Sequence, residues 1–208
     1  ESSFGYLYER QRDYEGALTH YRRAIEMAPD PSQYLLSAAI VYSLAGRDTE
    51  ALEYFKRALA RDTLNRRQEL SALTHLGRIL FARRDLKEAV EYLSRARAIA
   101  PADPRPILGL AETELRGSRP VAAIDFARKA LMIDSALPEA YSLIGLAYQR
   151  QGDVRRAYAA FKHAILHSRN RSQAYVRMGD LFSQHGKYNG ALEQYRQALA
   201  ADPKNAQA

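Results

Sequence analysis

The chain contains nearly the same sixteen-residue segment twice, and this internal repetition limits the possible folds more than any other feature. YEGALTHYRRAIEMAP occupies residues 14–29, and YNGALEQYRQALAADP occupies residues 188–203. A fixed period of 20–50 residues indicates a repeat architecture. The sequence therefore predicts six copies at a period of 34 residues, with one longer step of 38 residues. The shared motif begins at Ala17, Ala51, Ala89, Ala123, Ala157 and Ala191.

Each copy combines two amphipathic helical patterns with a short turn between them. Pro, Asp or Ser closes most copies, as expected where one helix stops and another starts. We therefore predict an all-α fold, an α-solenoid of stacked helix pairs that forms a single array over residues 1–208. The predicted turns within repeats are Arg12-Asp13, Gly46-Arg47-Asp48, Arg84-Asp85, Gly117-Ser118-Arg119-Pro120, Gly152-Asp153 and Gly186-Lys187. The predicted repeats span about 1–31, 32–65, 70–103, 104–137, 138–171 and 172–205, with a four-residue insertion at 66–69.

Three columns of the repeat hold the same kind of residue in every copy. A small residue recurs in the first helix, an alanine recurs early in the second helix, and another alanine follows seven residues later. In these columns the sequence resembles the tetratricopeptide repeat (TPR) family over essentially its whole length. The resemblance implies that helix A packs against helix B in each unit and that the units stack into a right-handed superhelix. The small column is Gly5, Ala39, Gly77, Ala111, Gly145 and Gly179; the second alanine column is Ala24, Ala58, Ala96, Ala130, Ala164 and Ala198; the bulky position between the alanines holds Tyr21, Phe55, Leu93, Ala127, Phe161 and Tyr195.

The physical properties of these residues agree with the resemblance. Small residues let two helix backbones approach closely, and we expect the bulky residues to fill the groove between stacked units. One helix pair cannot bury its apolar face alone, so at least three must stack. The chain has no starting Met and no polar capping helix at its end, where Ala206-Gln207-Ala208 would open another helix. We therefore expect part of a longer array, with a C-terminal end able to self-associate.

The composition argues against several classes of chemistry. The chain has no cysteine, which excludes disulfides, cysteine-ligated zinc and thiol catalysis. It shows no secretory signal pattern and no apolar run long enough to be a transmembrane segment. It has no phosphate-binding glycine loop and no nucleophile or zinc-protease motif. His163 and His167 are four residues apart and could face one metal ion, but no carboxylate or cysteine completes a zinc site. We predict no enzyme activity, no cofactor and no bound metal.

The resemblance implies that helix A builds the concave surface and that its exposed positions contact ligands. Chaperone-binding members of the family place Lys and Asn there to clamp a terminal carboxylate, and members linked to sugar transfer carry a ladder of Asn. Neither pattern is present here. An apolar strip instead suits a bound amphipathic helix or extended peptide; the alternative is that some of these side chains pack on the next helix. The predicted groove residues are Tyr6, Leu36, Ile40, Thr74, Arg78, Leu108, Glu112, Ser142, Leu146, Val176 and Asp180.

Arginines gather in the turns between helices A and B. The formal net charge is +7, and stacked repeats would align these turns along one edge. A row of guanidinium groups could bind an anionic polysaccharide, an acidic protein or lipid head groups; the alternative is a solvated, arginine-rich edge. The charge is spread and no binding module is present, so we predict no specific nucleic-acid binding. The predicted basic edge is Arg47, Arg83, Arg84, Arg119, Arg150, Arg155 and Arg156, with Arg10 and Arg12 in the first copy.

The fourth copy departs from the pattern. Glu114 stands where other copies have Tyr, Leu or Phe, and Ala127 replaces the usual bulky residue. A gap beside a carboxylate could form a small pocket or a flexible joint. We favour local repacking in which Phe126 or Arg116 fills the space.

Together these features predict a non-catalytic scaffold that binds a peptide or protein partner on its concave helix A surface. The alternative is a bacterial periplasmic scaffold of a cellulose-type or Pel-type exopolysaccharide secretion system, where long arrays of this repeat occur. A third reading is a cytoplasmic regulator or assembly factor in which the array presents another domain.

Overall fold

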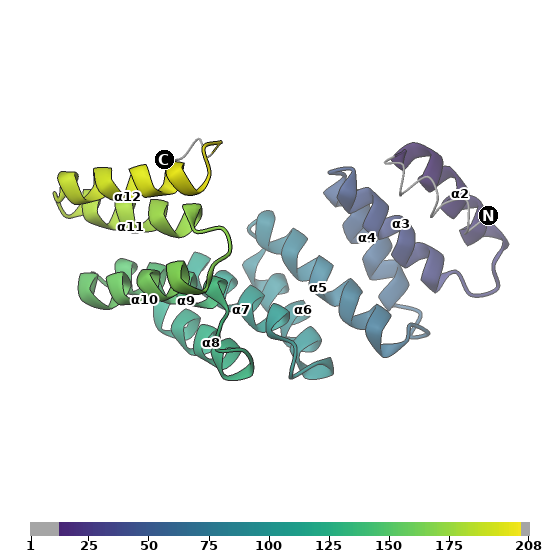
Figure 1. Cartoon of the computed structure of the whole chain (residues 1–208). Helices are drawn as coiled ribbons and strands as arrows, with labels where there is room; N and C mark the ends of the chain where they lie inside the picture. The colour runs from purple at the N-terminus through teal and green to yellow at the C-terminus, as the bar shows by residue number, and fades with distance from the viewer. Residues whose placement is uncertain (1–12, 205–208) are drawn as a thin grey trace. The chain divides into compact units, whose positions relative to one another are not determined.

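The computed structural model describes residues 13–204, which form eleven α-helices and no strand (Figure 1). The predictions for Gly5, Tyr6, Arg10, Arg12 and residues 206–208 lie outside the described residues. The chain divides into two compact units between Pro101 and Ala102, two residues before the predicted boundary of the third and fourth repeats. None of the described helices has both the length and the apolarity needed to cross a membrane.

The first unit is a stack of helices around one apolar core. Helices α3 and α4 form one hairpin and α5 and α6 form the next, while α2 packs on α3 and α4 packs on α5. Its helices are α2 (Tyr14–Met27), α3 (Ser32–Leu44), α4 (Asp48–Leu59), α5 (Arg66–Ala82) and α6 (Leu86–Ile99). The core joins side chains from every one of them, including Leu18, Leu35, Phe55, Leu76 and Ala89.

The second unit contains three hairpins. Helix α7 pairs with α8, α9 with α10 and α11 with α12, and successive hairpins stack through α8 on α9 and α10 on α11. These helices are α7 (Pro104–Arg116), α8 (Pro120–Ile133), α9 (Pro138–Arg150), α10 (Val154–His167), α11 (Ser172–Gln184) and α12 (Tyr188–Ala201). The predicted all-α fold of helix pairs is confirmed, because each predicted turn within the described residues separates two helices.

The four-residue insertion is helical and lengthens a helix A. Helix α5 has 17 residues, whereas α3, α7, α9 and α11 have 13 each; four residues add about one helical turn. Asn65 and Gln68 form a capping box in which each side chain accepts from the other's backbone N–H at 3.0 Å, and this starts the extra turn. Within that turn Arg66 donates to the carbonyl of Ile99, at the end of α6. Residues 66–69 are therefore the first turn of the third repeat and not a spacer before it.

Close packing of a bulky side chain on a glycine joins the two helices of a hairpin. A Cβ atom on Gly145 would lie 2.4 Å from a ring carbon of Phe161, and one on Gly179 would lie 2.5 Å from Tyr195. Gly77 has the same relation to Leu93, at 2.4 Å. In each case both residues belong to one repeat, so the bulky column packs within its own hairpin. Phe161 also packs between units as expected, because its core cluster includes Met178 and Leu181 of the next repeat.

The two alanine columns lie in the same contact. All their described members are between 0 and 6% exposed. A larger side chain at these positions would separate the helices, because the interior is already packed at crystal-like density.

Replacing Gly145 with alanine is expected to lower the free energy of unfolding by about 1–3 kcal/mol, because the new methyl overlaps the Phe161 ring. The double variant Gly145→Ala/Phe161→Ala reproduces the small pair Ala111 and Ala127 of the fourth repeat. It should cost less than the sum of the single changes, since the overlap is gone. Urea denaturation followed by circular dichroism measures all three variants. Strictly additive costs would contradict the assigned contact.

The turn from helix A to helix B has a residue in the left-handed conformation at the same position in all five described copies. The next residue donates its backbone N–H to a carbonyl five positions earlier, at 2.8–3.0 Å, which is the Schellman arrangement that ends many helices. Glycine adopts positive φ without steric cost, but other residues do so at a cost of about 1–2 kcal/mol. The left-handed residues are Gly46 (φ 73°), Arg84 (φ 68°), Ser118 (φ 58°), Gly152 (φ 77°) and Gly186 (φ 70°).

Changing Ser118 to glycine should raise the free energy of unfolding by about 0.5–1 kcal/mol, and Gly152→Ala should lower it by about 1 kcal/mol. The neighbouring Gly117 has an ordinary φ of −73°, so Gly117→Ala is the matched control. Thermal melts of the three variants test the turn. A Gly117→Ala penalty larger than that of Gly152→Ala would show that the left-handed position is misassigned.

Candidate functional site

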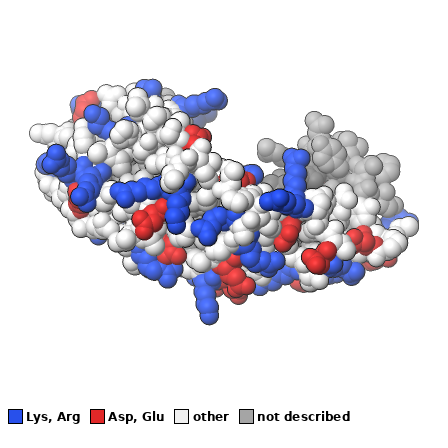
Figure 2. All heavy atoms as spheres, turned by 90° about the horizontal axis from the view of Figure 1, so that it is seen from below, with Lys and Arg blue, Asp and Glu red and all other residues white. Residues whose placement is uncertain are grey.

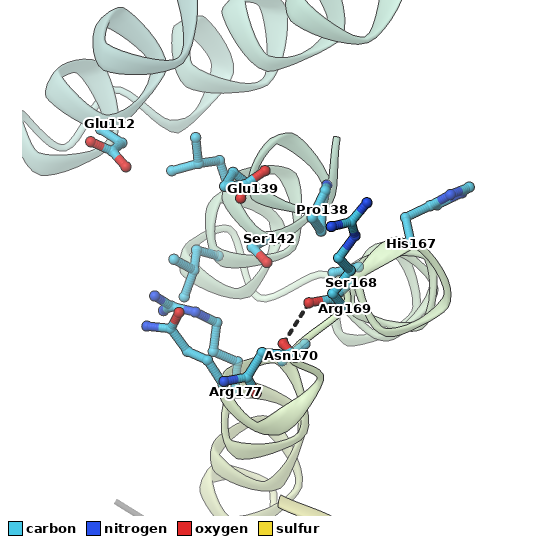
Figure 3. A pocket seen from close by; sticks show the side chains of 14 residues that line it. Glu112, Pro138, Glu139, Ser142, His167, Ser168, Arg169, Asn170 and Arg177 are labelled. Atoms are coloured by element: carbon cyan, nitrogen blue, oxygen red, sulfur yellow. Dashed lines mark hydrogen bonds between the residues drawn. The ribbon is translucent and has the colours of Figure 1, made fainter. Parts of the chain in front are cut away.

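A cleft of about 640 Å³ opens on the helix A side of the second unit. One wall is α9, with Pro138, Glu139, Ser142, Leu143 and Leu146, and Glu112 of α7 extends it (Figure 3). The opposite wall is α11, with Gln173, Ala174 and Arg177. The end of α10 and the loop 168–170 close one side through Ala164, His167, Ser168, Arg169 and Asn170.

Local sequence signals explain where these walls begin. Pro138 occupies the first turn of α9, where its missing N–H costs nothing. Asn170 accepts a hydrogen bond from the backbone N–H of Ser172 at 3.1 Å, and the buried Ser172 hydroxyl donates to the carbonyl of Ala198 at 2.8 Å. These bonds position the start of α11. The helix then places Gln173, in its first turn, and Arg177, in its second turn, on the cleft.

Charges of opposite sign face each other across the cleft. Loss of hydration raises the pKa of Glu112, the positive charges of Arg116 and Arg177 oppose this, and the negative charge of Glu139 adds to it. The Glu112 side chain is solvent-accessible, but the surrounding walls replace part of its water shell. Burial likewise lowers the pKa of Arg177, while Asp180 and Glu112 act in the opposite direction. Both groups are therefore charges held in a poorly hydrated place.

Three of the predicted groove residues, Glu112, Ser142 and Leu146, lie together on this cleft. Leu108 packs half-buried against the core beside them. Val176 is only 6% exposed and points into the protein interior. Asp180 accepts a hydrogen bond from the Tyr195 hydroxyl at 2.8 Å, and burial together with this bond raises the pKa of Tyr195 to about 12.

The predicted groove residues of the first unit are mostly committed to internal contacts. Leu36 is 6% exposed and belongs to the apolar core, and Ile40 packs against that core. The Thr74 hydroxyl donates to the carbonyl of Leu70 at 2.7 Å. Arg78 is exposed and donates to the Ser43 hydroxyl at 3.3 Å. The sequence predicts that Leu36 and Val176 are exposed on an apolar strip, but both side chains are buried within the protein.

Sequence reasoning missed most of the polar residues of the cleft, including Glu139, Gln173, Arg169 and Arg177. Glu139 and Gln173 lie one helical turn before the predicted Ser142 and Val176 and share one repeat position, 34 residues apart. The periodicity could have found this pair. Nothing in the pattern marked Arg177, because its counterparts in other copies include the buried Leu143.

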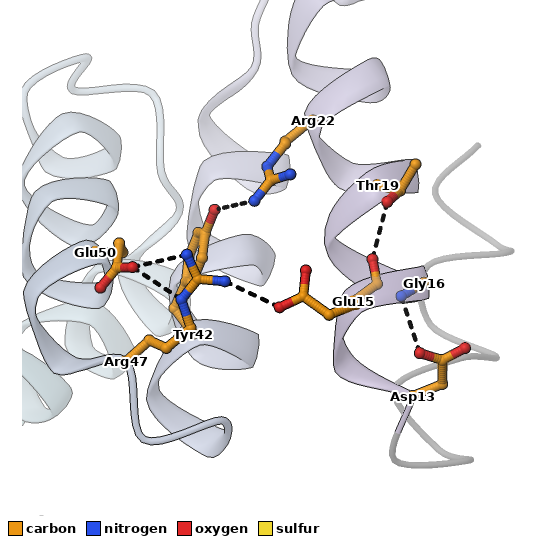
Figure 4. Close-up of polar contacts among 8 residues, drawn as sticks. All are labelled: Asp13, Glu15, Gly16, Thr19, Arg22, Tyr42, Arg47 and Glu50. Atoms are coloured by element: carbon orange, nitrogen blue, oxygen red, sulfur yellow. Dashed lines mark hydrogen bonds and ion pairs between the residues drawn. The ribbon is translucent and has the colours of Figure 1, made fainter.

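Five arginines of the predicted basic edge bind neighbours inside the protein. Arg47 bridges Glu15 at 2.9 Å and Glu50 at 2.7 Å and lies over the Tyr42 ring (Figure 4). The remaining contacts are Arg83 with Asp85 at 3.6 Å, Arg119 with Glu114, Arg156 with Asp153 at 3.4 Å, and Arg150 with the carbonyl of Leu115.

The other two edge arginines have different roles. Arg84 supplies the left-handed turn residue before α6, and Arg155 is exposed with no partner among residues 13–204.

On the face drawn in Figure 2, Lys and Arg side chains lie interspersed with Asp and Glu side chains. The edge is thus a mixed surface in which most guanidinium groups already have an acceptor.

The fourth repeat is repacked around its carboxylate: Phe126 packs against the core that contains Ala111 and Ala127, and Arg119, which was not predicted, pairs with Glu114. Glu114 is 7% exposed and its carboxylate pairs with the Arg119 guanidinium from the following turn. The backbone N–H of Arg119 also donates to the Glu114 carbonyl at 2.9 Å. The small Ala111 and Ala127 are both fully buried.

His163 and His167 stack on Tyr141 at the end of the α9–α10 hairpin. Their ring centroids lie 5.0 Å and 5.4 Å from that of Tyr141, and the two imidazoles are 6.4 Å apart and nearly parallel. Among residues 13–204 no three His, Cys, Asp or Glu side chains gather as metal ligands. The pair therefore serves as part of an aromatic cluster.

Family comparison agrees with the repeat fold. Two family models described as Tetratricopeptide repeat match this chain, one over residues 3–66 and 57–104 and the other over residues 138–169. A third model, described as TPR repeat, matches residues 179–208. The chain belongs to the tetratricopeptide repeat family, whose members typically mediate protein–protein interactions and are generally non-catalytic scaffolds.

Individual relatives are distant. The chain is 21% identical to the bovine (Bos taurus) BBSome complex member BBS4, over 93% of this chain and 43% of that protein; it spans about half the length of the curated relatives it matches. A tetratricopeptide repeat protein from Parabacteroides merdae superimposes with a TM-score of 0.86 at 15% identity, covering 98% of this chain and 79% of that one. YrrB, described as a TPR protein with an unusual peptide-binding site, gives a TM-score of 0.63 at 18% identity, covering 90% and 94%. These structural likenesses show the fold alone.

Replacing Arg119 with alanine should lower the free energy of unfolding by about 1–3 kcal/mol, because it leaves the buried Glu114 carboxylate without its partner. Arg155→Ala removes an exposed arginine that has no partner and should change stability by less than about 0.5 kcal/mol. Chemical denaturation of both variants makes the comparison. Equal, small effects would mean that Glu114 is satisfied in another way.

Proposed function

We propose that this chain is a non-catalytic interaction scaffold that binds an extended peptide or protein segment in the cleft between α9 and α11. The cleft itself carries the proposal, because it is a concave site of about 640 Å³ formed on the helix A side. Binding sites commonly fall between about 300 and 1,000 Å³.

The division of labour between the residues supports this proposal. The alanine and glycine columns hold each hairpin together, so polar cleft side chains such as Ser142 and Gln173 are not needed for the core. Rigid helices therefore present Leu146, Ser142 and Gln173 at defined positions, which lowers the entropy lost when a partner binds. The similar fold of YrrB, a TPR protein described as having a peptide-binding site, is consistent with this use of the helix A surface.

The basic edge supports the export alternative less well. A polyanion needs free guanidinium groups, whereas Arg47, Arg83, Arg119 and Arg156 are paired with carboxylates and Arg150 with a carbonyl. No observation on the described residues favours a polysaccharide partner, so peptide binding stands first.

Selection from a phage-displayed library of random dodecapeptides tests the proposal. Peptides enriched on the full chain should lose at least tenfold in affinity with Leu146→Arg, which places a long charged side chain in the cleft. Leu108→Arg, beside the cleft, should weaken binding in the same direction. Fluorescence anisotropy with the synthetic peptide gives the affinities.

Met132→Arg is the matched control, because Met132 is 86% exposed on α8 and outside the cleft. It should bind the peptide like the unchanged chain. Loss of binding in Met132→Arg, or retained binding in Leu146→Arg with unchanged helicity, would place the binding site elsewhere.

A further inference from the structure

The cleft has one acidic wall and one basic wall. Glu112 of α7 and Glu139 of α9 lie on one wall and Arg177 of α11 lies on the opposite wall, while Arg169 lies in the loop that closes one side, with its side chain directed toward Pro138 (Figure 3). All four line the same cavity, which lies within the second unit.

None of these four charges is in ion-pair contact with another side chain of the described residues. Across residues 13–204, none of Glu112, Glu139, Arg169 and Arg177 forms an ion pair or a side-chain hydrogen bond with another residue. Several other charges of the chain are paired closely, as Arg47 is with Glu50 at 2.7 Å and Lys56 with Glu88 at 3.0 Å. The cleft, in contrast, brings unpaired charges of both signs to the lining of one cavity.

The walls also weaken the hydration of two of these charges. Burial shifts the pKa of Glu112 upward and that of Arg177 downward, so in each case the ionised form is the one disfavoured by its surroundings. A ligand that brings opposite charges would replace the lost water with charge-assisted hydrogen bonds, which are the stronger kind. The long-range attraction between Glu112 and Arg177 does not supply this, since their side chains are not in contact.

Charge complementarity then decides what kind of segment fits. A wholly acidic segment would place carboxylates against Glu112 and Glu139, and a wholly basic one would place cations against Arg169 and Arg177. Like charges at short range oppose binding and so act against wrong partners. A purely apolar segment would leave all four charges unpaired while removing water from them.

We propose that the cleft selects an extended peptide segment carrying both a basic and an acidic side chain, the basic one bound by Glu112 and Glu139 and the acidic one by Arg177 and Arg169. This rests on the proposed peptide-binding function and specifies its partner. Between the two charged ends, Ser142 and Gln173 face the peptide backbone and Leu143 and Leu146 take an apolar side chain.

Capped, fluorescein-labelled octapeptides of defined charge order test this specificity on the full chain by fluorescence anisotropy. The probes share a leucine-containing centre and carry Lys then Glu, Glu then Lys, two Lys, two Glu or two Ala, at separations of two to five residues. One order of the mixed pair should bind at least tenfold more tightly than every probe with two like charges or two alanines. A probe with two Lys or two Glu that binds more tightly than both mixed orders would overturn the proposal.

Charge reversal at the two facing residues makes the test directional. Glu112→Lys and Arg177→Glu should each weaken the preferred mixed probe by at least tenfold. The double variant Glu112→Lys/Arg177→Glu should instead prefer the probe with the opposite charge order. If neither single variant changes the affinity, Glu112 and Arg177 do not bind the peptide charges and the proposal fails.

Glu91→Lys and Arg155→Glu are matched controls that make the same changes in net charge on exposed residues outside the cleft. They should leave the affinity within about twofold; a loss as large as that of the cleft variants would assign the effect to overall charge and overturn the proposal. Equal binding of the mixed and two-alanine probes would overturn the charge specificity and leave peptide binding intact. If no octapeptide and no library-selected peptide binds, the proposed function itself fails.

Discussion

The contact between a bulky helix B side chain and a glycine of helix A determines the spacing of the hairpins α5–α6, α9–α10 and α11–α12. Phe161 on Gly145 and Tyr195 on Gly179 leave no room even for a methyl group. Because glycine has no side chain, the ring of helix B packs directly on the backbone of helix A and the two helices approach closely. The alanines of the two columns are buried in the same contact. The positions of helix A, and with them both walls of the cleft, follow from this packing. The repeat therefore uses its most invariant positions for assembly and leaves the helix A surface for recognition.

Much of the fold could be predicted from the sequence because its determinants are local. Period, alanine columns and turn residues identify the helix pairs, and capping by Asp13 and Asp153 marks the starts of α2 and α10. The exceptions have local physical causes. A capping box at Asn65 makes the insertion part of α5, and the fourth turn places its left-handed conformation at Ser118 although a glycine stands immediately before it. Hydrogen bonds to backbone groups explain both exceptions: the Asn65–Gln68 capping box starts the helix early, and the bond from the Arg119 N–H to the Glu114 carbonyl closes the turn at Ser118.

The site was less predictable because it depends on how one hairpin is rotated against the next. Sequence columns describe which face of a helix is apolar, but they do not determine which residue at the edge of that face is covered. Leu36 and Val176 are covered, whereas Ser142 and Leu146 line the cleft. Arg177 reaches the cleft from a column that is buried in the preceding repeat, at Leu143. Glu112, Glu139 and Arg177 come from three successive repeats, so no single repeat contains the whole pattern.

The fourth repeat brings together three locally unfavourable features: a left-handed serine, a pair of small residues where other hairpins pack a ring or leucine on a small residue, and a buried carboxylate. In a repeat protein each unit is stabilised by its own contacts and those of its immediate neighbours, so such costs are not shared across the chain. The α7–α8 hairpin is thus the natural place for partial unfolding of the second unit to begin. Since Glu112 belongs to α7, the occupancy of the cleft and the integrity of its weakest repeat are thermodynamically linked: a bound segment that contacts Glu112 would also suppress local opening of that hairpin.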